Sequence, residues 1–247
     1  EEFWRENPGF DVILGNPPWD EATVEIDQFL MRHIPGFKGM KTNEREQVKN
    51  SLSEDDSELL MILEGEKEFA ERNRELMLKG EFPGMDTGDP DLYKAFSWRF
   101  WRLLRTEGRL GIVVPRSLFS SLGSAEWRKT VFPSSISKMV YCKNKGEWLF
   151  GDVNPAYMIS LFSLKKVNLE EANATPPSIE ISGTFSSVEE FENVTVDDPS
   201  PILIEDIVDF DSEELCIPLL NGGDEWPLWK KLANFPSIQS DQKREDF

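Results

Sequence analysis

The tetrad Asn16-Pro17-Pro18-Trp19 combines residue types that can hold and activate an amino group. An amine attached to an aromatic ring, such as N6 of adenine, is a poor nucleophile because its lone pair is delocalised into the ring. Two acceptors for its two N–H bonds localise that pair, and here Asn16 offers a side-chain carbonyl and Pro17 a main-chain carbonyl. The prolines hold the preceding residues extended and bring no N–H that competes for the amine. Acceptors preorganised in this way stabilise the positive charge that develops on the nitrogen.

Trp19 adds an aromatic face on which a base can stack, a contact worth about 1–3 kcal/mol per base. A base must leave the duplex to reach such a face. The same four residues can also form an ordinary turn that ends a strand, with the tryptophan in the core. Their position favours a site, because residues 10–15 predict a short buried strand and the carboxyl ends of strands are where α/β proteins bind ligands. We therefore predict that all four residues of the tetrad are catalytic.

The elements around the tetrad alternate between strand and helix. Asp89 is expected to cap a helix with Pro90 at its first position, and Gly108 to close it. Ser124 is expected to cap a second helix. Further strands are expected at residues 110–114, 138–142 and 156–164. This order predicts an α/β fold with a mostly parallel sheet and an antiparallel edge.

Two stretches depart from this alternation. Residues from about Thr42 to Gly80 are charged and follow a helical period, which predicts an inserted helical pair with Gly80 near its C-cap. After Lys166 the pattern weakens, with a strand expected at 178–182 and a short helix at 228–232. We expect residues 1–166 to form a partial catalytic domain that contains an insertion at 38–88. Residues 167–247 are expected to form a linker and an irregular acidic extension that leads toward a target-recognition region.

Charge is distributed unevenly along the 247 residues, whose formal net charge is −19. Such a balance argues against binding to phosphates, which favours basic proteins. Between Lys94 and Lys145, however, the acids are only Glu107 and Glu126, whereas no Lys or Arg occurs between Lys166 and Lys230. The asymmetry permits DNA contact at the basic stretch, and a solvated acidic tail beside a basic core is the plainer reading.

Cysteine and histidine are scarce, with only Cys142, Cys216 and His33. This excludes a disulfide scaffold and a Cys/His zinc site, so we expect no metal, and it fits a reducing, cytoplasmic compartment. His33 is expected to be an ordinary surface or packed residue. The opening residues lack a signal peptide pattern, and no apolar run approaches the length of a membrane span, so we expect no membrane contact.

The segment Phe10 to Trp19 (FDVILGNPPW) resembles the catalytic motif of S-adenosylmethionine-dependent amino-methyltransferases with a class I Rossmann-like fold. The wider pattern is similar to the Eco57I-type adenine-specific methylase domain of restriction–modification enzymes. Three further segments carry this likeness, namely residues 91–96, 108–115 and 148–151. The resemblance covers most of residues 10–165.

This resemblance implies roles for individual side chains. Asn16 and Pro17 would hold the target amine, Trp19 would stack on the base, and Phe150 would pack on the other side or edge of that base. Asn16, Pro17 and Phe96 would contact the cofactor, with Phe96 touching the adenine of S-adenosylmethionine. Phe96 also lies on the apolar stripe of its predicted helix, so core packing is an equal alternative.

One part of the family pattern is missing. The Gly-rich cofactor loop should precede the Asn-Pro-Pro motif, yet only fifteen residues precede Asn16, and Leu220-Asn221-Gly222-Gly223 lacks a convincing strand and helix around it. We therefore expect a companion, in the same polypeptide or in a separate subunit, to carry that loop, and negligible methyl transfer without it.

The resemblance implies a DNA adenine-N6 methyltransferase that acts on double-stranded DNA, as part of a restriction–modification or phage-defence enzyme. Two alternatives stay open. One is a protein-glutamine or RNA-guanine N-methyltransferase, since these use similar motifs. The other is a non-catalytic DNA-binding or assembly module that keeps a methylase fold.

Overall fold

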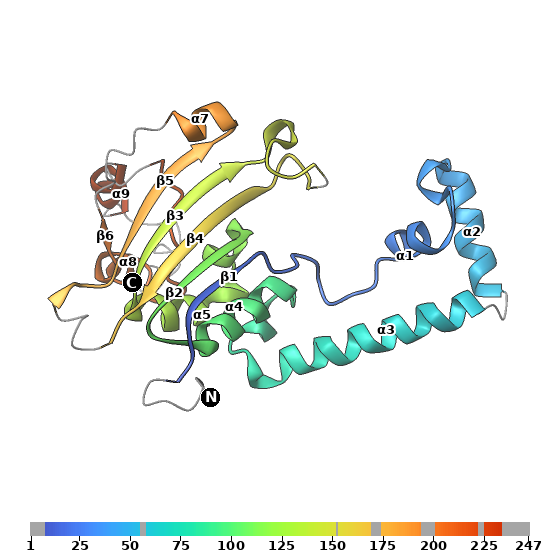
Figure 1. Ribbon diagram of the computed structural model, residues 1–247, viewed down its shortest axis with the longest axis horizontal. Helices are drawn as coiled ribbons and strands as arrows, with labels where there is room; N and C mark the ends of the chain where they lie inside the picture. The colour runs from blue at the N-terminus through green and yellow to red at the C-terminus, as the bar shows by residue number, and fades with distance from the viewer. Residues whose placement is uncertain are drawn as a thin grey trace, which may run out of the picture.

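A twisted six-stranded sheet forms the body of the protein, and a helical arm extends from it (Figure 1). The computed structural model describes residues 8–54, 58–151, 153–168, 174–193, 201–221 and 225–233. The strands are β1 (Phe10–Gly15), β2 (Leu104–Pro115), β3 (Ser135–Lys143), β4 (Met158–Lys166), β5 (Ser178–Phe185) and β6 (Ile202–Leu203). The α-helices are α1 (Ile26–His33), α2 (Thr42–Glu54), α3 (Glu58–Leu76), α4 (Leu92–Leu103), α5 (Ala125–Val131), α7 (Val188–Glu192), α8 (Ile204–Phe210) and α9 (Trp226–Ala233).

The strand order in the sheet is β1-β2-β4-β3-β5-β6. β1 pairs with β2, and β3 with β5, in parallel, whereas β4 runs antiparallel to both β2 and β3. The two-residue strand β6 is an antiparallel edge on β5. Four strands therefore share one direction, which confirms the α/β class and the mostly parallel sheet, while β4 is an antiparallel strand in the interior.

The helix after the arm begins and ends elsewhere than predicted. α4 begins at Leu92 with Asp91 at the N-cap, not at Pro90 with Asp89 as the cap. The reason is tertiary, because Leu92 N donates to Asp20 O at 3.0 Å and Ala22 N to Pro90 O at 3.4 Å. Residues 90–92 thus pair with the chain that follows Trp19 before the helix starts.

The C-terminal end of α4 was also predicted too late. The helix ends at Leu103, and β2 begins at once, so Gly108 lies within the strand instead of closing the helix. A Cβ on Gly108 would lie 2.8 Å from Arg105 O and 2.9 Å from the Leu104 side chain. The glycine is needed there for this close approach of strand residues, and not for a helix terminus.

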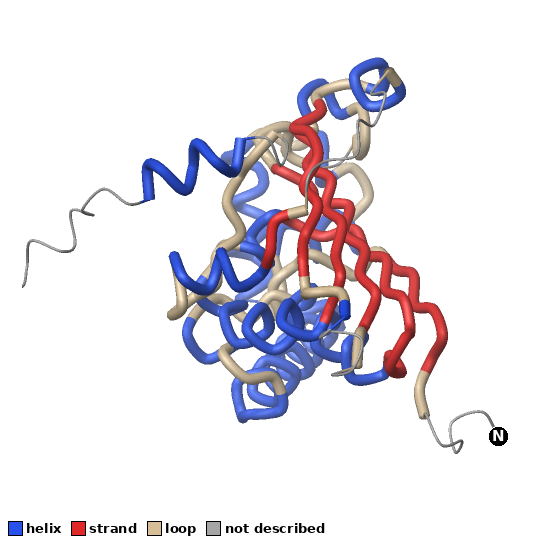
Figure 2. The backbone as a smooth tube through the Cα atoms, turned by 90° about the vertical axis from the view of Figure 1, so that its left-hand side faces the viewer, coloured by secondary structure: helices blue, strands red, loops and turns tan. Residues whose placement is uncertain are grey.

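Most helices lie on one side of the sheet (Figure 2). The core on this side contains an aromatic cluster in which the Phe162 ring of β4 lies 5.0 Å from Phe119 and 6.1 Å from Trp127 of α5. α5 begins after Ser124, as predicted, although the Ser124 side chain makes no capping bond. Burial of large aromatic rings is a dominant favourable term in folding, so this cluster anchors α5 to the sheet.

The arm has a small core of its own. Helices α1, α2 and α3 surround a cluster of buried apolar side chains, which are Phe29, Leu30, Phe37, Leu52 and Leu63. α2 and α3 occupy the region predicted as a helical pair, and the left-handed Gly80 (φ +94°) ends the helical run. Among the helices of the described residues, none is both long and apolar enough to cross a bilayer.

The chain after residue 166 returns to the sheet. The predicted strand at 178–182 is β5, and the predicted helix at 228–232 lies within α9. Residues 214–217 are held to the core by Arg128 of α5, which is fully buried. Its guanidinium donates to the main-chain oxygens of Leu118, Ser121, Glu214 and Leu215 at 2.8–3.0 Å. Burial lowers the pKa of Arg128, and these four acceptors offset the cost of placing a cation there.

We expect Arg128→Ala to lower the free energy of unfolding by about 3 kcal/mol or more, because it leaves four carbonyl groups without their buried donor. Urea unfolding followed by far-ultraviolet circular dichroism measures this change. The neighbouring Lys129→Ala is the control. Within the described residues Lys129 pairs with Glu126 near the surface, so we expect a change within about 0.5 kcal/mol. Equal stability of the two variants would contradict the role given to Arg128.

Candidate functional site

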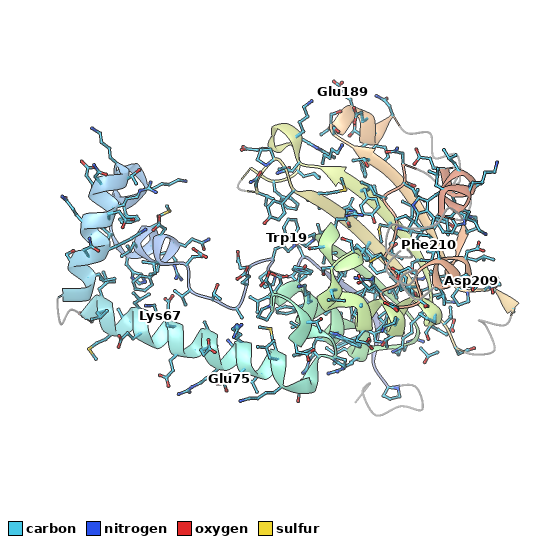
Figure 3. The ribbon with its side chains drawn as sticks, turned by 180° about the vertical axis from the view of Figure 1, so that it is seen from behind. Trp19, Lys67, Glu75, Glu189, Asp209 and Phe210 are labelled. Atoms are coloured by element: carbon cyan, nitrogen blue, oxygen red, sulfur yellow. The ribbon has the colours of Figure 1, made fainter. Side chains whose placement is uncertain are left out.

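The tetrad Asn16-Pro17-Pro18-Trp19 follows β1 at its carboxyl end, where the chain leaves the sheet toward the arm (Figure 3). Asn16 and Pro18 are exposed, Trp19 is half-buried and Pro17 is buried. The local sequence explains this exit, because Pro17 and Pro18 lack the N–H that would continue a β-ladder. The tetrad therefore lies at the end of the edge strand, with Asn16 and Pro18 exposed and Trp19 packed against the main core.

Trp19 joins the ends of three strands. Its indole Nε1–H donates to Val113 O of β2 at 3.3 Å. Its ring meets Phe150 edge-on, with centroids 5.6 Å apart and an interplanar angle of 78°. Phe150 lies in the loop after β3, and β1, β2 and β3 run in the same direction, so their carboxyl ends meet here. The structure thus brings together Trp19 and Phe150, two residues selected from the sequence.

The two expected acceptors are the Asn16 side-chain carbonyl and the Pro17 main-chain carbonyl. Within the described residues, neither the Asn16 side-chain amide nor the Pro17 carbonyl takes part in a hydrogen bond. The Asn16 amide is also exposed and not sealed beneath other side chains. Both groups therefore keep their capacity to accept hydrogen bonds within the described residues.

A polar cleft of about 520 Å³ opens beside Trp19. It lies between the chain after the tetrad, the arm and the start of β4, and its lining includes Glu21, Arg32, Glu66 and Tyr157. Carboxylates outnumber cations along its wall, since Asp20, Glu25 and Asp91 also line it. Such a wall repels phosphate groups and accepts N–H donors, so it suits a neutral polar ring better than a nucleic acid backbone.

A second polar cluster borders this cleft and was not selected from the sequence. The hydroxyl groups of Tyr93 and Ser117 lie 2.7 Å apart, and the buried Lys94 pairs with Asp91 at 2.8 Å. Burial raises the pKa of Tyr93, so its hydroxyl keeps its proton at neutral pH. Tyr93 and Lys94 fall within the segment 91–96, but no spacing in the sequence distinguishes them from ordinary helix residues.

Among the described residues, Phe96 makes a ring contact with Phe100 and none with Trp19 or Phe150. Its side chain is 38% exposed, so it is not the core residue that the apolar stripe allowed. Its ring lies 5.8 Å from that of Phe100, and the Phe100 ring would lie 3.4 Å from a Cβ built on Gly15. Phe96 is therefore exposed, and Phe100 lies between its ring and the end of β1.

The structure gives no evidence for a metal site in the described residues or for a catalytic role of His33. The described residues contain no cluster of three or more His, Cys, Asp or Glu side chains that could hold a metal ion. His33 packs against Phe29, with ring centroids 4.4 Å apart. Gly222 and Gly223 lie outside the described residues.

Comparison with known proteins gives distant structural likenesses only. No protein-family model matches the chain, and no curated protein is similar in sequence. A modification subunit of a proposed type I restriction enzyme from Vibrio vulnificus YJ016 matches 89% of this chain at 14% identity, with a TM-score of 0.45. A chain from a type I R-M system matches 94% at 13% identity, with a TM-score of 0.44. A chain of the DrdV–DNA complex matches 75% at 14% identity, with a TM-score of 0.41.

The chain spans 40% of each of the first two proteins and 16% of the third. At such identities and TM-scores these likenesses carry no assignment of function. The functional assignment therefore depends on the tetrad, its aromatic neighbours and the cleft.

We expect Trp19→Phe to lower the free energy of unfolding by about 1 kcal/mol, because it keeps an aromatic ring but removes the half-buried bond to Val113 O. Trp148→Phe is a matched control, since it removes an indole bond of the same type, to Lys143 O, at an exposed position. Thermal unfolding of both variants measures the difference. A larger loss in Trp148→Phe would contradict the anchoring role of Trp19.

Proposed function

We propose that this chain forms the target-adenine part of an S-adenosylmethionine-dependent DNA adenine-N6 methyltransferase of the restriction–modification type. The observation that carries this proposal is the pair of open acceptors on Asn16 and Pro17 beside the Trp19–Phe150 aromatic pair. The resemblance of residues 10–19 to the amino-methyltransferase motif supports the same reaction.

In the proposed reaction an extrahelical adenine enters beside Trp19, with its ring against the indole face. The Asn16 Oδ1 and Pro17 O atoms accept the two N–H bonds of its amino group and draw the nitrogen toward sp³ geometry. S-adenosylmethionine supplies a methyl group bound to a positively charged sulfur, which suits attack by this nitrogen. The N–C bond would form as the S–C bond of the sulfonium breaks and leaves a neutral thioether. Asn16 Oδ1 and Pro17 O would stabilise the positive charge that develops on the nitrogen until one of its protons passes to solvent.

The described residues fit one wall of a cofactor site. Phe96 offers an exposed aromatic surface for the adenine of S-adenosylmethionine, and its neighbour Phe100 lies against Gly15, the residue before Asn16. No Gly-rich turn between a strand and a helix occurs among the described residues. We therefore propose that a companion, in the same polypeptide or in another subunit, completes the site.

The position and exposure of β1 support such a companion. β1 is the outermost strand of the sheet, and its apolar side chains Val12 and Leu14 are 56% and 79% exposed. These two side chains lie on the same face of the strand, and exposed apolar surface of this kind is typical of a contact with another chain segment. Contact with double-stranded DNA is assigned to the basic stretch 94–145 and to a target-recognition region, because the cleft itself is acidic. We place the enzyme in the cytoplasm, where duplex DNA is its substrate.

We expect Asn16→Ala, in the complete enzyme with its companion, to reduce methyl transfer to duplex DNA by about 10²-fold or more, because one of the two acceptors is lost. Transfer of a radiolabelled methyl group measures the rate. Stability should stay within about 0.5 kcal/mol, since within the described residues the Asn16 side chain makes no hydrogen bond.

The control is Asn193→Ala at the exposed end of α7, which should leave the rate unchanged. Unaltered transfer by Asn16→Ala would remove this residue from the mechanism. Duplex DNA, free RNA and a protein bearing an accessible glutamine are compared as methyl acceptors. Transfer to protein or RNA alone would overturn the DNA assignment.

We expect Trp19→Ala to weaken capture of an extrahelical base while leaving overall DNA affinity nearly unchanged. Loss of one stacking surface corresponds to about 1–3 kcal/mol per base. The fluorescence of 2-aminopurine at the target position reports flipping, and a filter-binding assay reports affinity. A flipping signal equal to that of the parent enzyme would contradict the stacking role.

A further inference from the structure

Asn144 is a fully buried amide at the end of β3, in a position that the sequence does not single out. It directly follows the strand and opens the loop that carries Phe150. A buried amide is stable only when its donors and acceptors are paired, because each unpaired group loses its hydration without compensation. The partners of Asn144 therefore show what this residue does.

The Asn144 side chain uses its full bonding capacity on the Phe150 loop. Its Nδ2 donates to Phe150 O and to Val153 O, each at 2.8 Å. Its Oδ1 accepts from the main-chain N–H groups of Leu149 and Phe150, each at 3.2 Å. An amide has two N–H donors and two acceptor lone pairs, so all four are directed at one short segment.

The main chain of Asn144 closes the same loop. Asn144 N donates to Tyr157 O at 3.3 Å, and Asn144 O accepts from Glu147 N at 2.9 Å. Between these bonds the backbone takes left-handed conformations at Gly146 (φ +72°) and Glu147 (φ +58°). A loop with such turns has few ladder bonds of its own, so the Asn144 side chain is its main internal support.

Phe150 makes two hydrogen bonds with the Asn144 side chain, one through its N–H and one through its carbonyl. Its main chain is thus held on both sides, and its ring meets Trp19 edge-on at 5.6 Å. A ring placed on a loose loop would need ordering on each binding event, at a cost in conformational entropy. Asn144 removes this cost in advance.

We propose that Asn144 is a positioning residue that holds Phe150 against Trp19 and so shapes the pocket for the extrahelical base. This inference rests on the function proposed above. Asn144 does not touch the reacting atoms, and it acts through the Phe150 main chain. A general role in stability alone would affect the strands as much as the loop, so loop-specific readouts distinguish the two.

The first test measures amide hydrogen exchange in Asn144→Ala. We expect the protection of the Leu149 and Phe150 amides to fall by about tenfold or more, because their acceptor is removed. Amides within β3 and β4 should keep their protection. The matched control is Asn154→Ala in the same loop, whose side chain accepts one bond within the described residues, from Ala156 N at 2.9 Å. Equal protection at Leu149 and Phe150 in Asn144→Ala and the parent would overturn the inference.

The second test is a double-variant cycle in the complete enzyme, with 2-aminopurine fluorescence as the measure of base capture. We expect Asn144→Ala and Phe150→Ala each to reduce capture by about fivefold or more, and the double variant to be no weaker than Phe150→Ala. Asn154→Ala should bind as the parent does. Losses that multiply in the double variant would show that Asn144 acts apart from Phe150, and would overturn the inference.

Asn144→Asp tests the same point if the alanine variant does not fold. It keeps the size and the acceptor of the side chain but places a carboxylate against Phe150 O and Val153 O. We expect base capture to fall as in Asn144→Ala, and capture equal to that of the parent would overturn the inference. Normal base capture by Phe150→Ala would contradict the proposed base pocket at Trp19 and Phe150. Normal capture by the Asn144 variants, with reduced capture by Phe150→Ala, would contradict only the positioning role of Asn144.

Discussion

The site depends on one geometric constraint, which is that parallel strands place their carboxyl ends at the same edge of a sheet. β1 ends at the tetrad, β2 carries the Val113 carbonyl, and β3 leads into the loop with Phe150. The indole of Trp19 spans all three through one hydrogen bond and one ring contact. Residues far apart in the chain therefore form one surface, because each lies near the carboxyl end of a strand or in the segment that follows it.

The same edge explains why the acceptors of the tetrad stay open. The carbonyl of a strand residue normally accepts a hydrogen bond from a neighbouring strand. Pro17 and Pro18 lack an N–H, so strand pairing ends where β1 leaves the sheet. The Pro17 carbonyl and the Asn16 amide consequently keep their capacity for a ligand. The acidic cleft beside Trp19 favours N–H donors over phosphates, so the phosphates of the proposed DNA substrate would be contacted elsewhere, as the net charge of −19 also requires.

Polar side chains, more than apolar packing, determine where the irregular segments lie. Arg128 binds four carbonyl groups and holds residues 214–217 to the core, while Asn144 binds four groups of the loop that carries Phe150. Loops make few ladder bonds, so a single buried donor or acceptor can decide their path. β1 is the outermost strand among the described residues, and the proposed companion would lie beside it.

The sequence by itself determined the features that local chemistry controls. The apolar run before Asn16 correctly predicts the strand β1 but wrongly predicts its burial, because β1 is an edge strand with no buried residue. The prolines predict an exit from the sheet, and the periodic stretch 42–80 predicts α2 and α3. Tertiary structure alone decided the rest. Leu92 N bonds to Asp20 O and so delays α4, β4 inserts between β2 and β3, and Asn144 takes its role only when the Phe150 loop folds over it. These outcomes depend on partners distant in the chain, and residue spacing carries no record of such partners.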